Sequence, residues 1–287
     1  MYLRRNIAVL GGDMRQVHLA RLLMEDGHDV VTWGLEKGEG PNEAPLNLAL
    51  AREILIFPLP MCRNGELHLP LTDTMLSVEQ LWPRLRYDQL LLGGMTGELS
   101  QRLAVDHGLT LLDYYDREET QIANAVSTAE GAVQRAMEAT ERTLHGSRCL
   151  VIGFGRIGKL LAHMLQGMHA DVTASARKYS DLAWIDAYGY RGLRTDELAG
   201  HLSGFDVIFN TVPALVLDAG RLEEIDPACV ILELASVPGG VDHYAARKLG
   251  RNVLQASGLP GLVAPRSAAA ALRDSIYHIL EERGEPI

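Results

Sequence analysis

The stretch Cys149-Leu150-Val151-Ile152-Gly153-Phe154-Gly155-Arg156-Ile157-Gly158 decides the fold of this chain. A short apolar run leads directly into a GxGxxG motif, and residues 159–168 continue with helical character. In dinucleotide-binding βαβ units the first glycine permits a tight turn, the second lets the backbone approach the pyrophosphate, and the third allows close helix–strand packing. We therefore predict that residues 153–158 hold a dinucleotide. The alternative is a glycine turn in an α/β domain that binds none.

The residues that follow indicate which dinucleotide is bound. About twenty residues past such a motif, NAD sites carry Asp or Glu for the ribose 2′-hydroxyl. This chain has Ser175, Arg177 and Lys178 in that region and no acid. A planar guanidinium can donate two hydrogen bonds to a phosphate, so Arg177 suits a 2′-phosphate. We predict NADP in preference to NAD, against the alternative of a solvated loop with chance charges.

Two later segments follow predicted strands and add candidate ligand contacts. Cofactors lie at the carboxyl edge of a parallel sheet, where these segments fall. We expect contacts to the cofactor from Thr211, Val212, Pro213, Ala235 and Ser236, and contacts to the substrate from Gly239 and Gly240. Tight turns without a ligand explain the same glycines, and that alternative stays open.

Short apolar runs alternate with amphipathic stretches through the whole chain, which is typical of α/β proteins with parallel sheets. Strands are expected at 7–10, 29–33, 54–57, 90–92, 110–112, 149–152, 171–174, 207–210, 230–234 and 253–256. We predict two doubly wound parallel-sheet domains: an N-terminal, substrate-side α/β domain (1–126) and a Rossmann domain (146–262). A linking helix (127–145) with Ser127 as its N-cap joins them, and a C-terminal helix (263–287) packs back on the first domain.

Composition excludes several classes of protein. The 287 residues carry 27 basic and 37 acidic side chains, and this net charge of −10 argues against a general nucleic-acid binder. No stretch approaches the roughly 18 apolar residues of a membrane span. Cys62, Cys149 and Cys229 lack zinc-ligand spacing, so no metal is expected. We expect a soluble, cytoplasmic protein.

The sequence alone assigns no catalytic residue. It contains no GxSxG, HExxH or Walker A motif, and its ten histidines are scattered. In the first domain, Gly11-Gly12-Asp13 departs from GxGxxG, so a second dinucleotide site is not expected there. That turn offers Asp13 or Arg15 to a ligand, although an ion pair on the helix surface explains Arg15 equally well.

Several motifs in one order and spacing resemble the dipicolinate synthase A-subunit family of spore-forming bacteria. They are GGDMRQ (11–16), ANAVSTAEGAV (123–133), HGSRCLVIGFGRIG (145–158), SAR (175–177), NTVPA (210–214), ELASVPGGVD (233–242) and GLPGLVAP (258–265). The similarity covers nearly the whole chain and is weakest at 34–50 and 58–72.

This resemblance implies an NAD(P)-dependent oxidoreductase that converts a dihydrodipicolinate-type product of the lysine (diaminopimelate) pathway to dipicolinate. It further implies a sporulating mother cell, and a partner that is the flavoprotein-like B subunit; we also expect a homo-oligomer. A dicarboxylate substrate needs cationic or N–H donors, and the candidates are Arg15, Ser127, Thr128 and Arg266. For Ser127, a plain helix cap is the competing explanation. The rival functions are a 2-hydroxy-acid or amino-acid dehydrogenase and a non-catalytic nucleotide-binding regulatory subunit.

Overall fold

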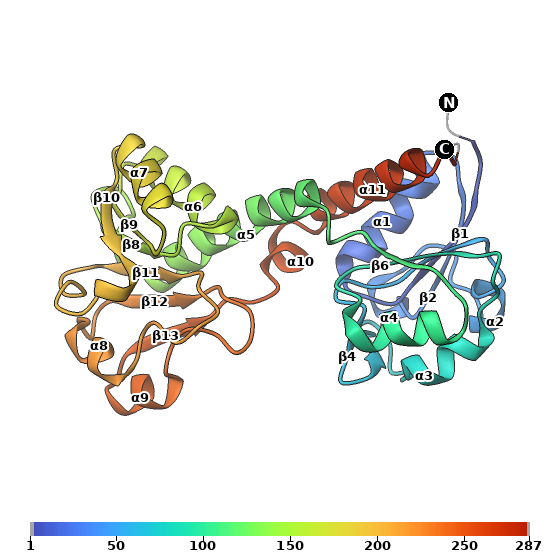
Figure 1. Ribbon diagram of the computed structural model, residues 1–287, viewed down its shortest axis with the longest axis horizontal. Coiled ribbons are helices and arrows are strands. Elements are labelled where there is room, and N and C mark those ends of the chain that lie inside the picture. Colours follow the sequence, from blue (N-terminus) through green and yellow to red (C-terminus); the bar gives the residue numbers. More distant parts are fainter. Residues whose placement is uncertain (1–2, 286–287) are drawn as a thin grey trace. The chain divides into compact units, whose positions relative to one another are not determined.

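The structure, a computed structural model, describes residues 3–285 and divides them into two compact units (Figure 1). Unit 1 holds residues 3–124 and 264–285, and unit 2 holds residues 125–263. Each unit is built around its own parallel sheet. The boundary falls inside α5 (Glu118–Ala139), so one continuous helix contributes residues to both units.

Unit 1 contains a five-stranded sheet in the order β2-β1-β3-β6-β7. Apart from the small β4–β5 pair, the order follows the flavodoxin-like doubly wound pattern. The strands are β1 (Asn6–Leu10), β2 (Asp29–Trp33), β3 (Ile54–Ile56), β6 (Leu90–Gly93) and β7 (Leu111–Asp113). The antiparallel pair comprises β4 (Cys62–Arg63) and β5 (Glu66–Leu67).

Successive apolar side chains of β1 point to opposite faces of the sheet, and helices cover both faces. Ile7 and Val9 face one apolar cluster, with α1 (Met14–Glu25) and α11 (Pro265–Glu282). Ala8 and Leu10 face the other cluster, with the remaining helices. Those helices are α2 (Leu46–Ala49), α3 (Val78–Leu81) and α4 (Gly97–Asp106). The C-terminal helix α11 therefore packs beside α1 on the first unit.

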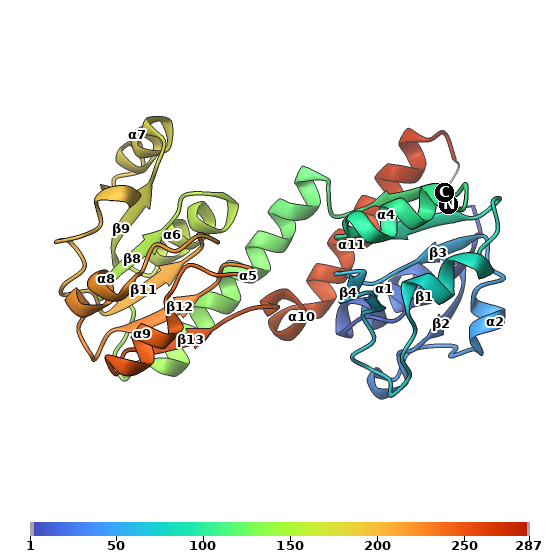
Figure 2. The same ribbon diagram turned by 60° about the horizontal axis from the view of Figure 1, so that its bottom comes forward.

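Unit 2 contains a six-stranded parallel sheet in the order β10-β9-β8-β11-β12-β13, which is the Rossmann order 3-2-1-4-5-6. The strands are β8 (Arg148–Ile152), β9 (Asp171–Ala176), β10 (Arg191–Arg194), β11 (Val207–Asn210), β12 (Val230–Glu233) and β13 (Asn252–Gln255). The helices are α6 (Arg156–Gly167), α7 (Tyr179–Ala187), α8 (Ala219–Glu224), α9 (His243–Lys248) and α10 (Leu259–Val263). Figure 2 shows α6 and α9 on opposite sides of this sheet, in agreement with the two apolar clusters of the unit.

The predicted α/β class with two doubly wound parallel sheets, a long connecting helix and a returning C-terminal helix is confirmed. Most strand boundaries lie within two residues of the expected ones. The sequence does not predict β10 or the β4–β5 pair, because neither carries an apolar alternation that marks a buried strand.

The predicted start of the linking helix at Ser127 is wrong. The helix begins at Glu118 and ends at Ala139, so Ser127 and Thr128 lie inside it and are buried. The acidic pair Glu118 and Glu119 occupies the first turn, where negative charge favours the positive end of the helix dipole. The Ser-x-x-Glu pattern marks a helix start only where the chain is not already helical. Ser127 and Thr128 therefore offer no helix N-terminus to an anion.

The helix expected from residue 263 onward is also divided in two. α10 ends at Val263, and α11 begins at Pro265 after Ala264 leaves the helical conformation at φ −142°. Proline has no N–H and is favoured in the first turn of a helix, so Pro265 starts a new helix and does not continue the old one.

Replacing Leu272 by alanine should destabilise unit 1. Leu272, on α11, is 2% exposed and packs in the apolar cluster formed with α1 and the sheet, so its removal leaves a cavity. We expect a loss of about 2–5 kcal/mol in the free energy of unfolding. Urea denaturation followed by Trp33 and Trp82 fluorescence, in a Trp184→Phe background, isolates unit 1. The exposed control Val105→Ala should change stability by less than about 0.5 kcal/mol; equal effects of the two variants would contradict this packing.

Candidate functional site

The glycine turn after β8 has the shape of a phosphate cradle. Gly153 has φ +95°, and a Cβ on it would lie 2.5 Å from Thr211 Oγ1. A Cβ on Gly158 would lie 2.0 Å from the carbonyl oxygen of Gly153. A Cβ on Gly155 would meet nothing within 4 Å. The turn is thus closed where helix and strand touch and open at the one position where a pyrophosphate must approach the backbone.

The N-terminus of α6 supplies the electrostatic part of this cradle. Gly155 is the N-cap in an extended conformation, and no side chain caps the helix. The first-turn N–H groups of an α-helix have no intrahelical partner, and the dipole adds a partial positive charge there. Both features favour a phosphate. The residues present therefore fit a dinucleotide.

Phe154 and Ile157 have a structural side-chain role in this turn. The Phe154 ring is 4% exposed and lies 6.4 Å and 6.5 Å, centroid to centroid, from Tyr190 and Tyr188. Ile157 packs against the same apolar cluster. Their backbone, and not their side chains, is the part available to a cofactor, whereas Arg156 is exposed.

The two cations predicted for the 2′-phosphate lie at one end of the unit 2 sheet. Arg177 and Lys178 are exposed and follow directly after β9, at the carboxyl edge of the sheet. Ser175 corrects the prediction: its hydroxyl is fully buried and lies 3.1 Å from that of Thr195, so it cannot reach a phosphate. Its carbonyl instead accepts a hydrogen bond from Gly153 N at 3.0 Å, which ties the glycine turn to β9.

The end of β11 lies against the glycine turn. Thr211 donates its hydroxyl to Ile152 O at 2.9 Å, and a Cβ on Gly153 would lie 2.8 Å from Val212 Cγ2. Pro213 lies one residue later and is exposed. The structure therefore brings this segment, predicted to line the cofactor, beside the motif that was predicted to bind it.

The segment after β12 is organised by a buried carboxylate. Glu233 is fully buried and accepts hydrogen bonds from Asn210 Nδ2 at 2.8 Å, Ala235 N at 3.1 Å and Gly240 N at 2.8 Å. The sequence does not predict this role, because a carboxylate at a strand end carries no signal of the donors that satisfy it. Ser236 remains exposed in the same segment.

The N–H groups of Gly239 and Gly240, two predicted substrate contacts, both bond within the chain. Gly240 N donates to Glu233, and its carbonyl accepts from both Val216 N and Leu217 N at 2.9 Å. Gly239 N donates to Ser236 O at 2.9 Å. Both glycines fold the segment back on itself, as expected from the alternative that they serve a tight turn and not a ligand.

The predicted substrate residues are distributed over both units. Arg15 lies in unit 1, in the first turn of α1, and pairs with Asp13. Arg266 is exposed in the first turn of α11. The pKa of His18, on α1, is lowered by burial first, then by the charge of Arg21, and then by the charge of Arg266. Ser127 and Thr128 are buried in the part of α5 that belongs to unit 2.

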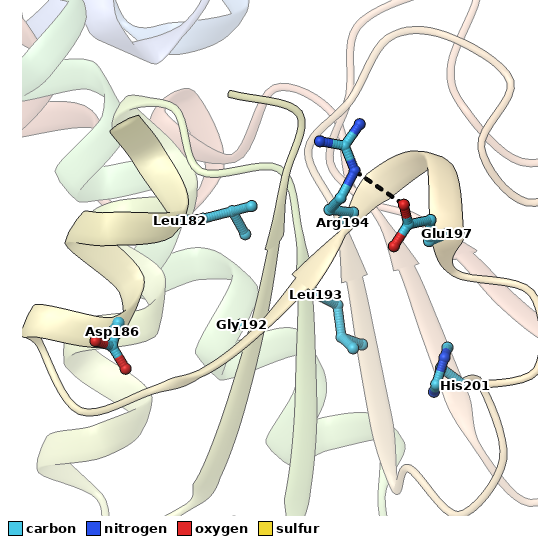
Figure 3. A pocket seen from close by; sticks show the side chains of 7 residues that line it. All are labelled: Leu182, Asp186, Gly192, Leu193, Arg194, Glu197 and His201. Atoms are coloured by element: carbon cyan, nitrogen blue, oxygen red, sulfur yellow. Dashed lines mark ion pairs between the residues drawn. The ribbon is translucent and has the colours of Figure 1, made fainter. Parts of the chain in front are cut away.

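A groove of about 380 Å³ runs along the outer strand of unit 2, between α7 and β10 (Figure 3). Its lining includes Leu182 and Asp186 from α7, and Arg194, which pairs with Glu197. None of the predicted site residues is among its lining residues. Arg194 nevertheless lies opposite Ala176 in the sheet, next to the predicted phosphate cations.

Residues 3–285 hold neither a metal centre nor a membrane-spanning helix. No group of three or more His, Cys, Asp or Glu side chains in that range is arranged to hold a metal ion. Within the same range, no helix combines the length and the apolar character needed to cross a membrane.

Comparison with known proteins agrees with the geometry of both units. Residues 6–115 match the family model for the N-terminal domain of the A subunit of dipicolinate synthase. Residues 114–232 match the NAD binding domain of D-isomer specific 2-hydroxyacid dehydrogenases. The dipicolinate synthase A subunit of Bacillus subtilis (strain 168) is 32% identical over 289 residues, which covers 96% of each chain. This chain belongs to the dipicolinate synthase A-subunit family.

Solved structures of the family show the same fold over nearly the full length. The A subunit of Bacillus halodurans matches with a TM-score of 0.87 and 27% identity, covering 98% of this chain and 99% of that one. The A subunit of Bacillus subtilis matches with a TM-score of 0.85 and 30% identity, covering 98% and 97%. The predicted family resemblance is confirmed. The chain is a dehydrogenase-like NAD(P)-dependent oxidoreductase with a nicotinamide dinucleotide cofactor.

Alanine at Gly155 and at Gly158 should separate cofactor binding from folding. Gly155→Ala meets no protein atom, so stability should change by less than about 1 kcal/mol, while the new methyl group would enter the space expected for the pyrophosphate. We expect cofactor affinity to fall about tenfold or more. Gly158→Ala forces the helix away from Gly153 and should lower both stability and binding.

Titration of NADPH fluorescence and thermal unfolding of both variants measure these two quantities. Wild-type affinity in Gly155→Ala would mean that the pyrophosphate does not lie on this turn.

Proposed function

We propose that this chain is the NADP-dependent subunit of a dipicolinate synthase. It would oxidise a dihydrodipicolinate-type acid of the lysine (diaminopimelate) pathway to pyridine-2,6-dicarboxylate. The observation that carries the proposal is full-length membership of the A-subunit family, together with a phosphate cradle followed by two cations after β9.

The chemistry is the removal of a hydride and a proton from a partly reduced ring. The product is aromatic, so the oxidation has a favourable direction. When bound, the nicotinamide ring accepts the hydride. The chain contributes the backbone of Gly153–Gly158 for the pyrophosphate, and Thr211, Val212, Pro213, Ala235 and Ser236 for the ribose and nicotinamide end. No side chain is assigned as the acceptor of the proton.

The preference for NADP is supported by the surroundings of Arg177 and Lys178. Neither cation makes an ion pair with any residue between 3 and 285, so both charges are available to a phosphate. Arg194, in the neighbouring strand, is already paired with Asp196 and Glu197. A 2′-phosphate therefore has two uncommitted cations at the end of β9.

The assembly and its setting follow from the relatives. They are named as A subunits, which supports the existence of a second, different subunit. We propose that this partner is a flavoprotein-like B subunit, that the chain forms a homo-oligomer, and that both proteins act in the cytoplasm of a sporulating mother cell.

The 2-hydroxy-acid dehydrogenase alternative is favoured by one observation, the match of residues 114–232 to that group's NAD binding domain. That match concerns the cofactor half only. A non-catalytic nucleotide-binding subunit fits the same match. An assay for substrate turnover distinguishes the dipicolinate synthase, the 2-hydroxy-acid dehydrogenase and the non-catalytic nucleotide-binding subunit.

A coupled assay should show dipicolinate formation. Pyruvate and aspartate semialdehyde, with the synthase that condenses them, generate the unstable substrate in place, and this chain and NADP⁺ are added with and without the B subunit. We expect dipicolinate, measured by chromatography, in step with NADPH formation, measured by its absorbance. Product from this chain alone places the site within it, whereas a requirement for the second protein means a shared or activated site. No product above the rate without the chain, while NADP⁺ binds, would exclude the proposed function.

Arg177→Ala should weaken NADP binding selectively. Loss of charge-assisted hydrogen bonds costs about 1.5–3 kcal/mol, or roughly 10–150-fold in affinity for NADP, while NAD affinity stays unchanged. Arg191→Ala is a matched control, since Arg191 is an exposed arginine at the opposite end of the same sheet. Calorimetric titration with both cofactors gives the ratio. An unchanged NADP/NAD ratio in Arg177→Ala would show that this residue does not read the 2′-phosphate.

A further inference from the structure

The carboxyl edge of the unit 1 sheet has a crevice-forming topology of its own. β1 leads into α1 on one face, whereas the chain after β3 passes to the cluster on the other face. Because these neighbouring strands send their connections to opposite sides, ligands of such sheets bind between their carboxyl ends. In this unit the expected binding position lies between the Gly11–Gly12 turn, after β1, and the segment that begins at Phe57, after β3.

Arg15 is fixed at this point as a buried cation. The residue is 7% exposed, and its Nε and Nη2 donate to the two Asp13 carboxylate oxygens at 2.9 Å and 2.8 Å. Nη2 also donates to Leu59 O, after β3, at 2.5 Å. The guanidinium thus bridges the two strand ends. Its Nη1 donates to no residue between 3 and 285, and it is not sealed from solvent.

Gln16, beside Arg15, carries a second sign of a missing polar partner. Its side chain is fully buried and interacts with the Tyr114 hydroxyl, which itself donates to Phe57 O, but neither amide atom has a hydrogen-bond partner of good geometry among the described residues. A Cβ on Gly12 would lie 2.5 Å from Gln16 Oε1, so the amide folds over the glycine turn. An unsatisfied buried polar group costs about 1–3 kcal/mol. Leucine would fill the same space without that cost, so packing alone does not explain the amide.

Two arginines act on the groups around the turn. The negative charge of Asp13 offsets the positive charge of Arg15. The pKa of His68 is lowered mainly by burial and next by the charge of Arg63, so Arg63 also acts at this turn. His68 O accepts from Gly12 N at 2.9 Å, which places that residue on the turn. The carboxylates nearby are those of Asp13 and Asp113, since both charges act on Tyr114 together with that of Arg15. Two arginines therefore offer an anionic ligand local attraction at the turn, although the chain carries −10 overall.

We propose that the β1–α1 turn of unit 1 is a carboxylate-binding subsite, in which Arg15 Nη1 contacts one carboxylate of the substrate and Gln16 provides a neighbouring amide. The inference rests on the proposed function for the identity of the acid, a dihydrodipicolinate-type dicarboxylate whose aromatic product is pyridine-2,6-dicarboxylate. The site itself requires only a small organic acid with a free carboxylate. Asp13 and Leu59 O act as positioning groups, because they fix the orientation of the guanidinium.

Calorimetric titration of the full chain, saturated with NADP⁺, tests the subsite directly. The probes are pyridine-2,6-dicarboxylate, pyridine-2-carboxylate and pyruvate. Arg15→Met should weaken binding of the dicarboxylate roughly 10–150-fold, the range for one lost charge-assisted contact. Arg21→Met is the matched control: it lies on the same helix, donates to Glu39 O, and should bind with wild-type affinity. Unchanged NADP⁺ affinity in Arg15→Met verifies that unit 2 is intact.

A second variant keeps the test decisive if Arg15→Met does not fold. Gln16→Leu removes the unsatisfied amide, so it should fold with equal or greater stability and bind the dicarboxylate several-fold more weakly. Reduced stability together with unchanged affinity would assign Gln16 to packing and count against the subsite.

The outcomes also separate the subsite from the proposed function. If the wild-type chain binds pyruvate but neither pyridine acid, and Arg15→Met loses that binding, the subsite stands and the proposed function fails. If the wild-type chain binds none of the acids, or if Arg15→Met binds them with unchanged affinity, the subsite is overturned.

Discussion

One contact that only a glycine can make underlies the cofactor half of this molecule. The Cα of Gly158 approaches the carbonyl of Gly153 so closely that a Cβ would lie 2.0 Å from the oxygen. Because of that approach α6 can begin directly against the end of β8, and its free N–H groups are aimed at the open side of Gly155. Any bulkier residue would move the helix off the strand and remove the anion site with it. Phosphate recognition here is therefore a property of backbone packing before it is a property of any side chain.

The parts of this fold that could be predicted are those imposed by burial. In a parallel sheet covered on both faces, strands are continuous apolar runs, and runs such as 149–152 and 207–210 have no other stable position. The edge strand β10, with the sequence RGLR, carries no such pattern and depends on pairing with β9 for its conformation. The false start at Ser127 has a related cause: a local capping pattern was outweighed by the preceding residues from Glu118 onward, which already form the helix.

Within the site, residues required by backbone geometry could be predicted, and residues that satisfy buried partners could not. The spacing of Gly153, Gly155 and Gly158 determines their roles wherever the motif lies between a strand and a helix. Ser175 carried an equally plausible role in the sequence, but its hydroxyl bonds to that of Thr195, from a later part of the chain. Glu233 is likewise held by donors from three separate positions. Such partners are brought together only by the tertiary fold, so no pattern of neighbours along the chain reveals them.

The two proposed anion sites both depend on local groups but present their cations differently. The chain is acidic overall, so its average field repels an anionic ligand, and each recognition site depends on groups within a few ångströms. In unit 2 the cations Arg177 and Lys178 are exposed and unpaired with any described residue, which suits a phosphate that remains solvated on one side. In unit 1 the cation is buried and held in one orientation by Asp13 and Leu59 O. A fixed, partly desolvated guanidinium discriminates by geometry more than a mobile surface charge does, because little rotamer freedom remains to be lost on binding. The contrast matches the two proposed tasks: the 2′-phosphate would be one of many contacts of a large cofactor, whereas the carboxylate subsite would orient a small dicarboxylic acid with few contacts.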